Sequence, residues 1–346
     1  MLRRVKEAVK RMPLLAMTGV FVLRVLRGFD TYRRILQACP AQEAGNIYFM
    51  DYDGSGDTYL TCGYLAYKGM IGPKDAFVGS GGLSLKIGKL FGFGRFVAVE
   101  PKAALNVRVM ERFLGKRLEL CPLLYESEYL EYSGILRFMS GYRGLDFMSM
   151  LKIGMDINCG LDYEEGTWTQ PEFPWTPEEV EEIFQVHGLR PGKTALIAPY
   201  AGKNDMWGIP AGFYEKLAQQ LLMEGFTVCT NSYDPQREPA VPGTAPILIP
   251  HRLMRAFCEK AGCFIGLRSG LCDIVSAAKD CKKIILYGEM TIPSASASHQ
   301  EFFSLDAMGL CSDCLEVAYK SGQKDEIVSQ LVSAAKAHAD RLCIRD

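Results

Sequence analysis

Short apolar runs alternate with helical patterns along the 346-residue chain, and this alternation restricts the possible folds more than any other feature. In the first half, the runs IYFM (47–50), DAFVG (75–79) and RFVAVE (95–100) are each followed by a turn and a helical pattern. Strands separated by helices pair in parallel, because each helix carries the chain back to the same edge of the sheet. The sequence therefore predicts an α/β fold with parallel sheets.

The strand and helix pattern begins again after RPGKT (190–194). A helix is expected just before this point, with Thr176 as its N-cap, Pro177 in its first turn and Gly188 as its end. A chain of this length is too long for one small domain. We predict two Rossmann-like domains that face each other across a cleft, preceded by a basic helical segment. Their ranges are 46–188 and 189–346, after a segment at 1–45.

The composition is that of an ordinary globular protein, with 48% hydrophobic and 23% charged residues. The net charge of −1 argues against a nucleic-acid partner. Several of the twelve cysteines lie inside apolar runs, which is typical of buried thiols in a reducing, cytoplasmic compartment. Cys311 and Cys314 form the only CxxC motif, and no further ligand pair completes a zinc site. We expect no metal, and favour a plain loop or a partner contact there.

The N-terminal segment is strongly basic and contains an apolar stretch from Met12 to Leu23. A membrane span needs about 20 apolar residues, and Arg24 and Arg27 interrupt this one. Two interpretations stay open. The segment packs on the domain as a helix, or it lies as a basic amphipathic helix on an anionic membrane surface. The second would make the protein peripheral on the inner face of the cell membrane.

The run FIGLRSGLCDIV (264–275) joins a strand that ends at Leu267 to a helix that begins at Leu271. Ligands of open α/β sheets bind beyond the carboxyl ends of strands, and helix N-termini favour phosphate. Gly270 would let a ligand approach the backbone, Ser269 offers a hydroxyl and Arg268 a permanent charge. The pattern favours a phosphate or diphosphate ligand. The alternative is that Ser269 caps the helix and Arg268 forms a surface salt bridge.

Asp273 lies in the first turn of the same helix, where it either compensates the helix dipole or holds hydroxyls of a ribose or donor sugar. Of the four histidines, only His299 lies where it could reach the predicted cleft.

The run DGSGDTYL (53–60) forms a second glycine loop before a helix, with Gly54, Gly56 and Asp57 in the turn. A carboxylate at a helix N-terminus is stabilised as the anion, so Asp57 could serve only as a cap. An ionised aspartate in a cleft can also take a proton from a hydroxyl nucleophile.

Three segments together resemble the bacterial heptosyltransferase-like glycosyltransferases of family 9. NIYFMDYDGSGDTYLTCGYLAYK (46–68) is similar to their opening strand, Gly-Asp loop and helix. ALIAPYAGKNDMWGIPAGFYEKLAQQLLMEGFTV (195–228) is similar to the start of their donor domain. FIGLRSGLCDIVSAAKDCKKIILYG (264–288) is similar to their donor-site segment, and the three occur in the family's order.

The resemblance implies a GT-B fold, with the acceptor on the N-terminal domain and a nucleotide-sugar on the C-terminal domain. It implies an inverting, metal-independent transfer with no cofactor, in which Asp57 is the general base. Its diphosphate contacts fall on Ser269, Gly270 and Leu271, and Lys203 with Asn204 would add donor contacts from the loop after residue 198. The acceptor would be a cell-surface glycan or a lipid-linked one, as in lipopolysaccharide or capsule biosynthesis.

This chain departs from the family in its donor domain. The family's basic residue directly before Trp207 has no match here, since Asp205 and Met206 precede it, and Lys203 would take its place. Two further departures lie in the donor-site segment. The family's Asp before Thr-Gly is Arg268 here, and its His is Asp273. RSGLCD also resembles fucosyltransferase-like GT-B enzymes, in which an arginine assists the donor diphosphate. Two other functions stay open on the same fold: a sugar-nucleotide epimerase or hydrolase, and a non-catalytic nucleotide-sugar-binding subunit of a glycan assembly complex.

Overall fold

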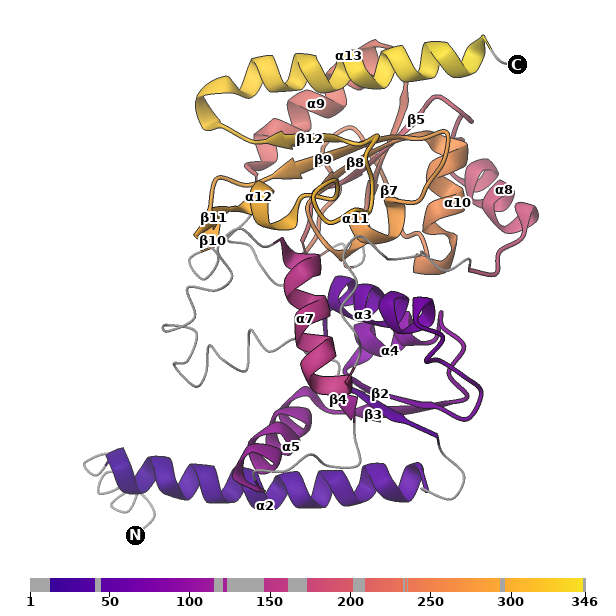
Figure 1. Cartoon of the computed structure of the whole chain (residues 1–346). Helices are drawn as coiled ribbons and strands as arrows, with labels where there is room; N and C mark the ends of the chain where they lie inside the picture. The colour runs from indigo at the N-terminus through magenta and orange to yellow at the C-terminus, as the bar shows by residue number, and fades with distance from the viewer. Residues whose placement is uncertain are drawn as a thin grey trace. The chain divides into compact units, whose positions relative to one another are not determined.

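The computed structural model describes most of the chain, which divides into two compact units (Figure 1). The first unit comprises Met1–Glu126 with Gly154–Asp162, and the second comprises Ser127–Ile153 with Tyr163–Asp346. The described residues are 13–40, 45–114, 121–122, 146–160, 173–201, 209–232, 234, 236–292 and 296–344.

The first unit is built on a parallel sheet with the strand order β3-β2-β1-β4. The strands are β1 (Ile47–Met50), β2 (Ala76–Ser80), β3 (Arg95–Val99) and β4 (Cys121–Pro122). β1 lies between β2 and β4, so the chain leaves it toward β2 on one side and reaches β4 on the other. Such a reversal of strand order opens a crevice at the carboxyl ends of the two strands. The loop that carries Asp57 follows β1 at this point.

Helices cover both faces of this sheet (Figure 1). α2 (Pro13–Ala38) and α5 (Pro101–Leu114) share one core with the sheet, in which Val25 and Ile35 of α2 join Ile47 and Phe49. The two helices approach closely at Gly28, where an added Cβ would lie 2.4 Å from the main-chain oxygen of Asn106. α3 (Ser55–Tyr67) and α4 (Gly82–Gly88) lie on the opposite face. The basic N-terminal segment thus contains a helix that packs on the domain.

The second unit holds a larger parallel sheet, with the strand order β12-β9-β8-β5-β6-β7. Its strands are β5 (Thr194–Ala198), β6 (Thr227–Asn231), β7 (Ala245–Ile247), β8 (Gly262–Leu267), β9 (Lys282–Tyr287) and β12 (Leu315–Ala318). The order reverses between β5 and β8, which pair with Ala198 opposite Gly266. The predicted α/β fold with parallel sheets is confirmed in both units.

Helices also lie on both faces of the second sheet (Figure 1). α9 (Ala211–Met223) and α13 (Lys324–Cys343) cover one face and share its main core cluster. α10 (His251–Ala261) and α11 (Gly270–Val275) lie on the other face. The remaining elements are α7 (Phe147–Cys159), α8 (Pro177–Val186), β10 (Thr291–Ile292), β11 (Ala297–Ser298), α12 (His299–Phe303) and the 3-10 turn Ser321–Gln323.

α8 begins as the sequence predicts, because Thr176 and Glu179 form a reciprocal capping box. The helix packs against α10, where Glu179 accepts a 2.8 Å hydrogen bond from Arg252 Nη1 and the rings of Phe184 and Phe257 lie 5.2 Å apart. We therefore place α8 with the second unit, earlier in the chain than the predicted boundary between residues 188 and 189.

Candidate functional site

The segment that joins β8 to α11 lies at the point where the strand order of the second sheet reverses. All six residues of β8 are buried, while Ser269 and Gly270 are half-buried. Ser269 has extended backbone angles at the N-cap position, and among the described residues its side chain makes no capping hydrogen bond. Its main-chain oxygen instead accepts from the Cys272 amide at 2.9 Å. Ser269 and Gly270 are therefore the residues of this loop that stay partly open to solvent at the carboxyl end of β8.

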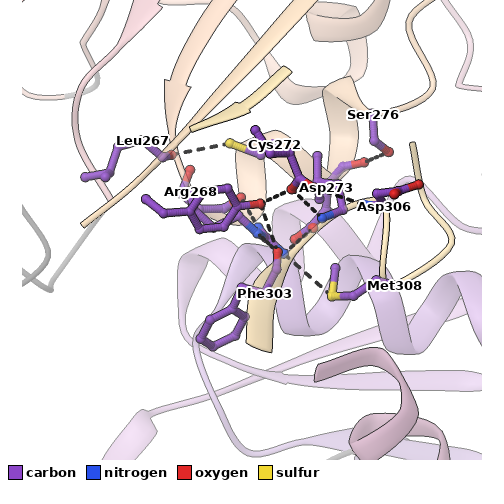
Figure 2. Close-up of polar contacts among 12 residues, drawn as sticks. Leu267, Arg268, Cys272, Asp273, Ser276, Phe303, Asp306 and Met308 are labelled. Carbon is purple, nitrogen blue, oxygen red and sulfur yellow. Dashed lines mark hydrogen bonds and ion pairs between the residues drawn. The ribbon is translucent and has the colours of Figure 1, made fainter. Parts of the chain in front are cut away.

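Arg268 points toward Asp273 and Phe303 (Figure 2). It is only 4% exposed, and its Nη2 lies 2.7 Å from Oδ1 of the buried Asp273. Its Nε donates to the main-chain oxygen of Phe303 at 2.8 Å, and its Nη1 donates to that of Ser269 at 2.7 Å. This is neither the surface salt bridge nor the ligand-facing charge that the sequence left open. Arg268 supports the loop from inside the unit through hydrogen bonds to main-chain oxygens, and Asp273 is its ion-pair partner.

The arginine keeps its charge despite its burial. Burial alone would lower the pKa of Arg268, but the Asp273 carboxylate stabilises the guanidinium and raises that pKa above its usual value. Because the two opposite charges are 2.7 Å apart, the pair presents little net charge to the loop above it.

The carbonyl that receives Arg268 belongs to a chain segment held by Glu316 on β12. Glu316 accepts hydrogen bonds from the Tyr287 hydroxyl, from Ser304 Oγ at 2.6 Å and from the Leu305 amide at 2.7 Å. Two of these bonds fix the segment that follows α12, and the third, from Tyr287 at the end of β9, holds the Glu316 carboxylate itself. Sequence reasoning missed Glu316, and its one signal is a lone acidic residue within the apolar strand LEVA.

His299 is fully buried beside this network. Its Nδ1 accepts a hydrogen bond from the Gly288 amide at 3.2 Å, which requires an unprotonated Nδ1. Burial, and secondarily the charge of Arg268, lower the pKa of His299 to about 4. The ring lies in the core of the second unit. This burial does not support the sequence-based expectation that His299 reaches a cleft.

In the first unit, the carboxylate of Asp57 lies over Gly54 in the first turn of α3. An added Cβ at Gly54 would lie 2.4 Å from Oδ2 of Asp57 and 2.5 Å from the ring of Tyr52. A larger residue at position 54 would require the Asp57 carboxylate and the Tyr52 ring to shift. Asp57 is half-buried, and Gly56 precedes it in the same turn.

Two further aspartates of the run MDYDGSGD have structural roles that the sequence did not reveal. Asp53 caps α4, since its Oδ1 accepts from the amides of Leu83 and Ser84 at 2.9 and 3.0 Å. Asp51 Oδ2 lies 2.9 Å from Nε of the buried Arg108. Asp57, the third aspartate of the run, lies in the first turn of α3.

Two predicted donor residues, Lys203 and Asn204, lie outside the described residues. Leu271 is buried in the first turn of α11 and can offer a ligand only its main chain. Within the described ranges, no group of three or more His, Cys, Asp or Glu side chains is arranged to hold a metal ion.

No protein-family model matches the chain, and no curated protein matches its sequence. Solved structures match its fold. A glycosyl transferase of family 9 from Veillonella parvula DSM 2008 has a TM-score of 0.54 at 14% identity, over 86% of this chain and 97% of that one. The E. coli ADP-heptose lps heptosyltransferase II has a TM-score of 0.55 at 11% identity, over 86% and 99%. The chain therefore has the GT-B fold of these glycosyltransferases, and the resemblance seen in the sequence is confirmed at the level of fold.

Breaking the buried ion pair is expected to destabilise the protein strongly. Arg268→Met or Asp273→Leu alone should lower the free energy of unfolding by about 3–5 kcal/mol, because each leaves one buried charge without its partner. The double variant should cost less than the sum of the two, since no charge is left. Urea unfolding at pH 7 measures this. Arg34→Ala, which removes an exposed ion pair with Asp30, is the control and should change little. Equal effects in all variants would contradict the bracing role.

His299 should make stability depend on pH. Its pKa is about 4 in the folded chain and near the ordinary 6.5 when unfolded, so the unfolded state binds the extra proton between these values. Stability is fully present above about pH 6.5 and is lost as the pH falls toward 4, by about 1–3 kcal/mol. Urea unfolding at pH 6.5 and 4.5 should show a smaller loss for His299→Asn, whose amide oxygen can still accept from Gly288. An unchanged loss in the variant would exclude His299 as the titrating group.

Proposed function

We propose that this protein is an inverting, metal-independent glycosyltransferase, which moves a sugar from a nucleotide-sugar to a hydroxyl of a glycan or lipid-linked acceptor. The observation that carries the proposal is the GT-B fold, shared over 86% of the chain with a glycosyl transferase of family 9. A loop with the expected chemistry lies at the strand-order reversal of each sheet. The E. coli neighbour is described as an ADP-heptose heptosyltransferase, which supports a nucleotide-sugar as donor.

The donor would bind at the carboxyl ends of β5 and β8. Ser269 and Gly270 lie at this edge, half-buried, and the first turn of α11 offers main-chain N–H groups to a diphosphate. Because Asp273 compensates the charge of Arg268, we assign Arg268 and Asp273 a positioning role. Lys203 and Asn204, which follow β5 in the sequence, would then supply the side-chain contacts to the departing nucleotide.

The acceptor would bind in the first unit beside Asp57. Its hydroxyl would lose a proton to the Asp57 carboxylate as its oxygen attacks the anomeric carbon, and the nucleoside diphosphate would leave from the opposite face. Gly54 matters to this step because it leaves room for the carboxylate to lie over the turn. A sugar-nucleotide epimerase or hydrolase would need no acceptor, and a non-catalytic binding subunit would not need Asp57.

Replacement of Asp57 separates these functions. Asp57→Asn should lower the rate of sugar transfer by about 10²–10⁴-fold, because the amide cannot take the proton. Nucleotide binding should persist, measured as a rise in melting temperature with a panel of nucleoside diphosphates and nucleotide-sugars. Asp30→Asn, an exposed change on α2, is the control. Transfer at the wild-type rate in Asp57→Asn would refute the base assignment, and nucleotide binding without any transfer in the wild type would favour a binding subunit.

We further propose that the enzyme is cytoplasmic and binds peripherally to an anionic membrane. The exposed side chains of α2 support this part of the proposal. The charged residues between 20 and 34 are four arginines and one aspartate, a net charge of +3, and all five are exposed. The exposed apolar residues of the same stretch are Val20, Phe21, Val22, Leu23, Leu26 and Phe29. Apolar and basic side chains on one helix fit the interface of a bilayer. Among the described helices, none is long and apolar enough to span a membrane.

Membrane binding can be tested with vesicles. The wild type should sediment with vesicles of phosphatidylglycerol and phosphatidylcholine, and less with phosphatidylcholine alone. Leu26→Glu should weaken binding about tenfold, since burial of a leucine side chain contributes about 1.5–3 kcal/mol. Met223→Glu, at a 79% exposed apolar site on α9 in the other unit, is the matched control. Equal binding of both variants would contradict a membrane role for α2.

A further inference from the structure

The CxxC motif forms a compact turn between α12 and β12. The Cys311 thiol donates to Oδ1 of Asp313 at 3.0 Å, and the Cys314 thiol donates to the main-chain oxygen of Cys311 at 3.2 Å. The Cys311 amide in turn donates to the main-chain oxygen of Leu305 at 3.2 Å. The two thiols are thus held on one turn by bonds from both their side chains and the main chain.

A buried cation lies beside this turn. The side chain of Lys283 is 4% exposed, and its Nζ lies 2.8 Å from the same Asp313 oxygen that receives the Cys311 thiol. The Lys283 Nζ also donates to the main-chain oxygen of Ala278 at 2.7 Å, which fixes its position. Burial would lower the pKa of Lys283, but Asp313 raises it, so the ammonium persists. The Lys283 ammonium favours the Cys311 thiolate, and the Asp313 carboxylate between them offsets part of that effect.

Cys311 differs from the buried thiols elsewhere in the unit, whereas the interaction with Cys311, together with burial, raises the pKa of Cys314. Interaction with Cys314 lowers the pKa of Cys311, burial and the hydrogen bond to Asp313 oppose this, and Lys283 lowers the pKa further. Burial instead raises the pKa of Cys263, and raises that of Cys229 to about 12, which makes both thiols unreactive. Cys311 is 6% exposed, Cys314 is half-buried, and the side chain of Asp313 is 72% exposed. A small oxidant fits this limited access better than a protein partner does.

We propose that Cys311 and Cys314 are a dithiol that a peroxide oxidises to a reversible intramolecular disulfide. In the first step, the Cys311 thiolate attacks one oxygen of hydrogen peroxide, the O–O bond breaks, and a sulfenic acid and hydroxide form. In the second step, the Cys314 sulfur attacks the sulfenic sulfur, the S–O bond breaks, and the disulfide forms with loss of water. Two electrons pass from the two sulfurs to the peroxide. A dithiol reductant reverses the reaction by exchange.

Tryptic digestion separates this pair from the other cysteines, so its oxidation can be measured on one peptide. Trypsin should release residues 284–320 as one peptide, which contains Cys311 and Cys314 and no other cysteine. After the folded full-length protein is treated with hydrogen peroxide and its remaining thiols are blocked, this peptide should have lost two hydrogen atoms. Dithiothreitol should restore it. Oxidation of Met290 or Met308 adds oxygen to the same peptide and is distinguished by mass. Cys311→Ser and Cys314→Ser should each abolish the loss of hydrogen.

The rate tests whether the surroundings activate the pair. At pH 6.5, disulfide formation in the folded protein should be about tenfold faster than in urea, where Lys283 no longer lies beside the turn. Asp313→Asn should speed the reaction about twofold or more, since the Asp313 carboxylate accepts from the Cys311 thiol and favours its protonated form. A turn with only a structural role would not respond in this direction. The exposed Cys343, in a separate tryptic peptide, reports that the oxidant was active.

Three outcomes would overturn the proposal. One is oxidation of Cys343 with no disulfide in the 284–320 peptide. A second is an equal rate in the folded protein and in urea, which would mean that any chain with this spacing reacts alike. The third is one equivalent of tightly bound zinc that is lost in Cys311→Ser, which would make the pair metal ligands. None of these readouts uses nucleotide or sugar, so the inference stands or falls separately from the proposed transfer reaction.

Discussion

The ion pair between Arg268 and Asp273 determines how the second unit is built around the end of β8. Removing two charges from water costs several kcal/mol for each ion, and the cost is offset only when nearly every donor finds an acceptor. Arg268 meets this requirement with Asp273 and with the main-chain oxygens of Ser269 and Phe303. Strand β8, helix α11 and the end of helix α12 are thereby fixed to one guanidinium. A loop supported in this way offers a ligand a surface that needs little rearrangement.

Glu316 supports the same arrangement from the edge strand of the sheet. It holds the segment after α12 through Ser304 and Leu305, and that segment places the Phe303 oxygen where Arg268 can reach it. Two carboxylates far apart in the sequence thus act on one arginine, Asp273 directly and Glu316 through the main chain. Polar networks of this kind are stable only when each member is satisfied, so they tolerate few substitutions.

The sequence was sufficient for features that depend on local periodicity. The strands around IYFM and FIGL, the N-cap role of Thr176 and the α/β class follow from patterns within a few residues. The direction of the Arg268 side chain does not, because an arginine after a strand reaches either outward to a ligand or inward to a carboxylate five residues later. The same limit applies to the aspartates at 51, 53 and 57. One pairs with Arg108 and one caps α4, and both partners are distant in sequence.

The close approach of α2 and α5 at Gly28 has a consequence for how this protein can be handled. Val25 and Ile35 of α2 belong to the same apolar core as Ile47 and Phe49 of the first sheet. Helix α2 therefore carries exposed apolar side chains on its outer side and also closes the core of the first unit. Truncation of α2 to improve solubility would expose that core to water. Substitution of its exposed apolar side chains would preserve the core and is the better choice for protein production.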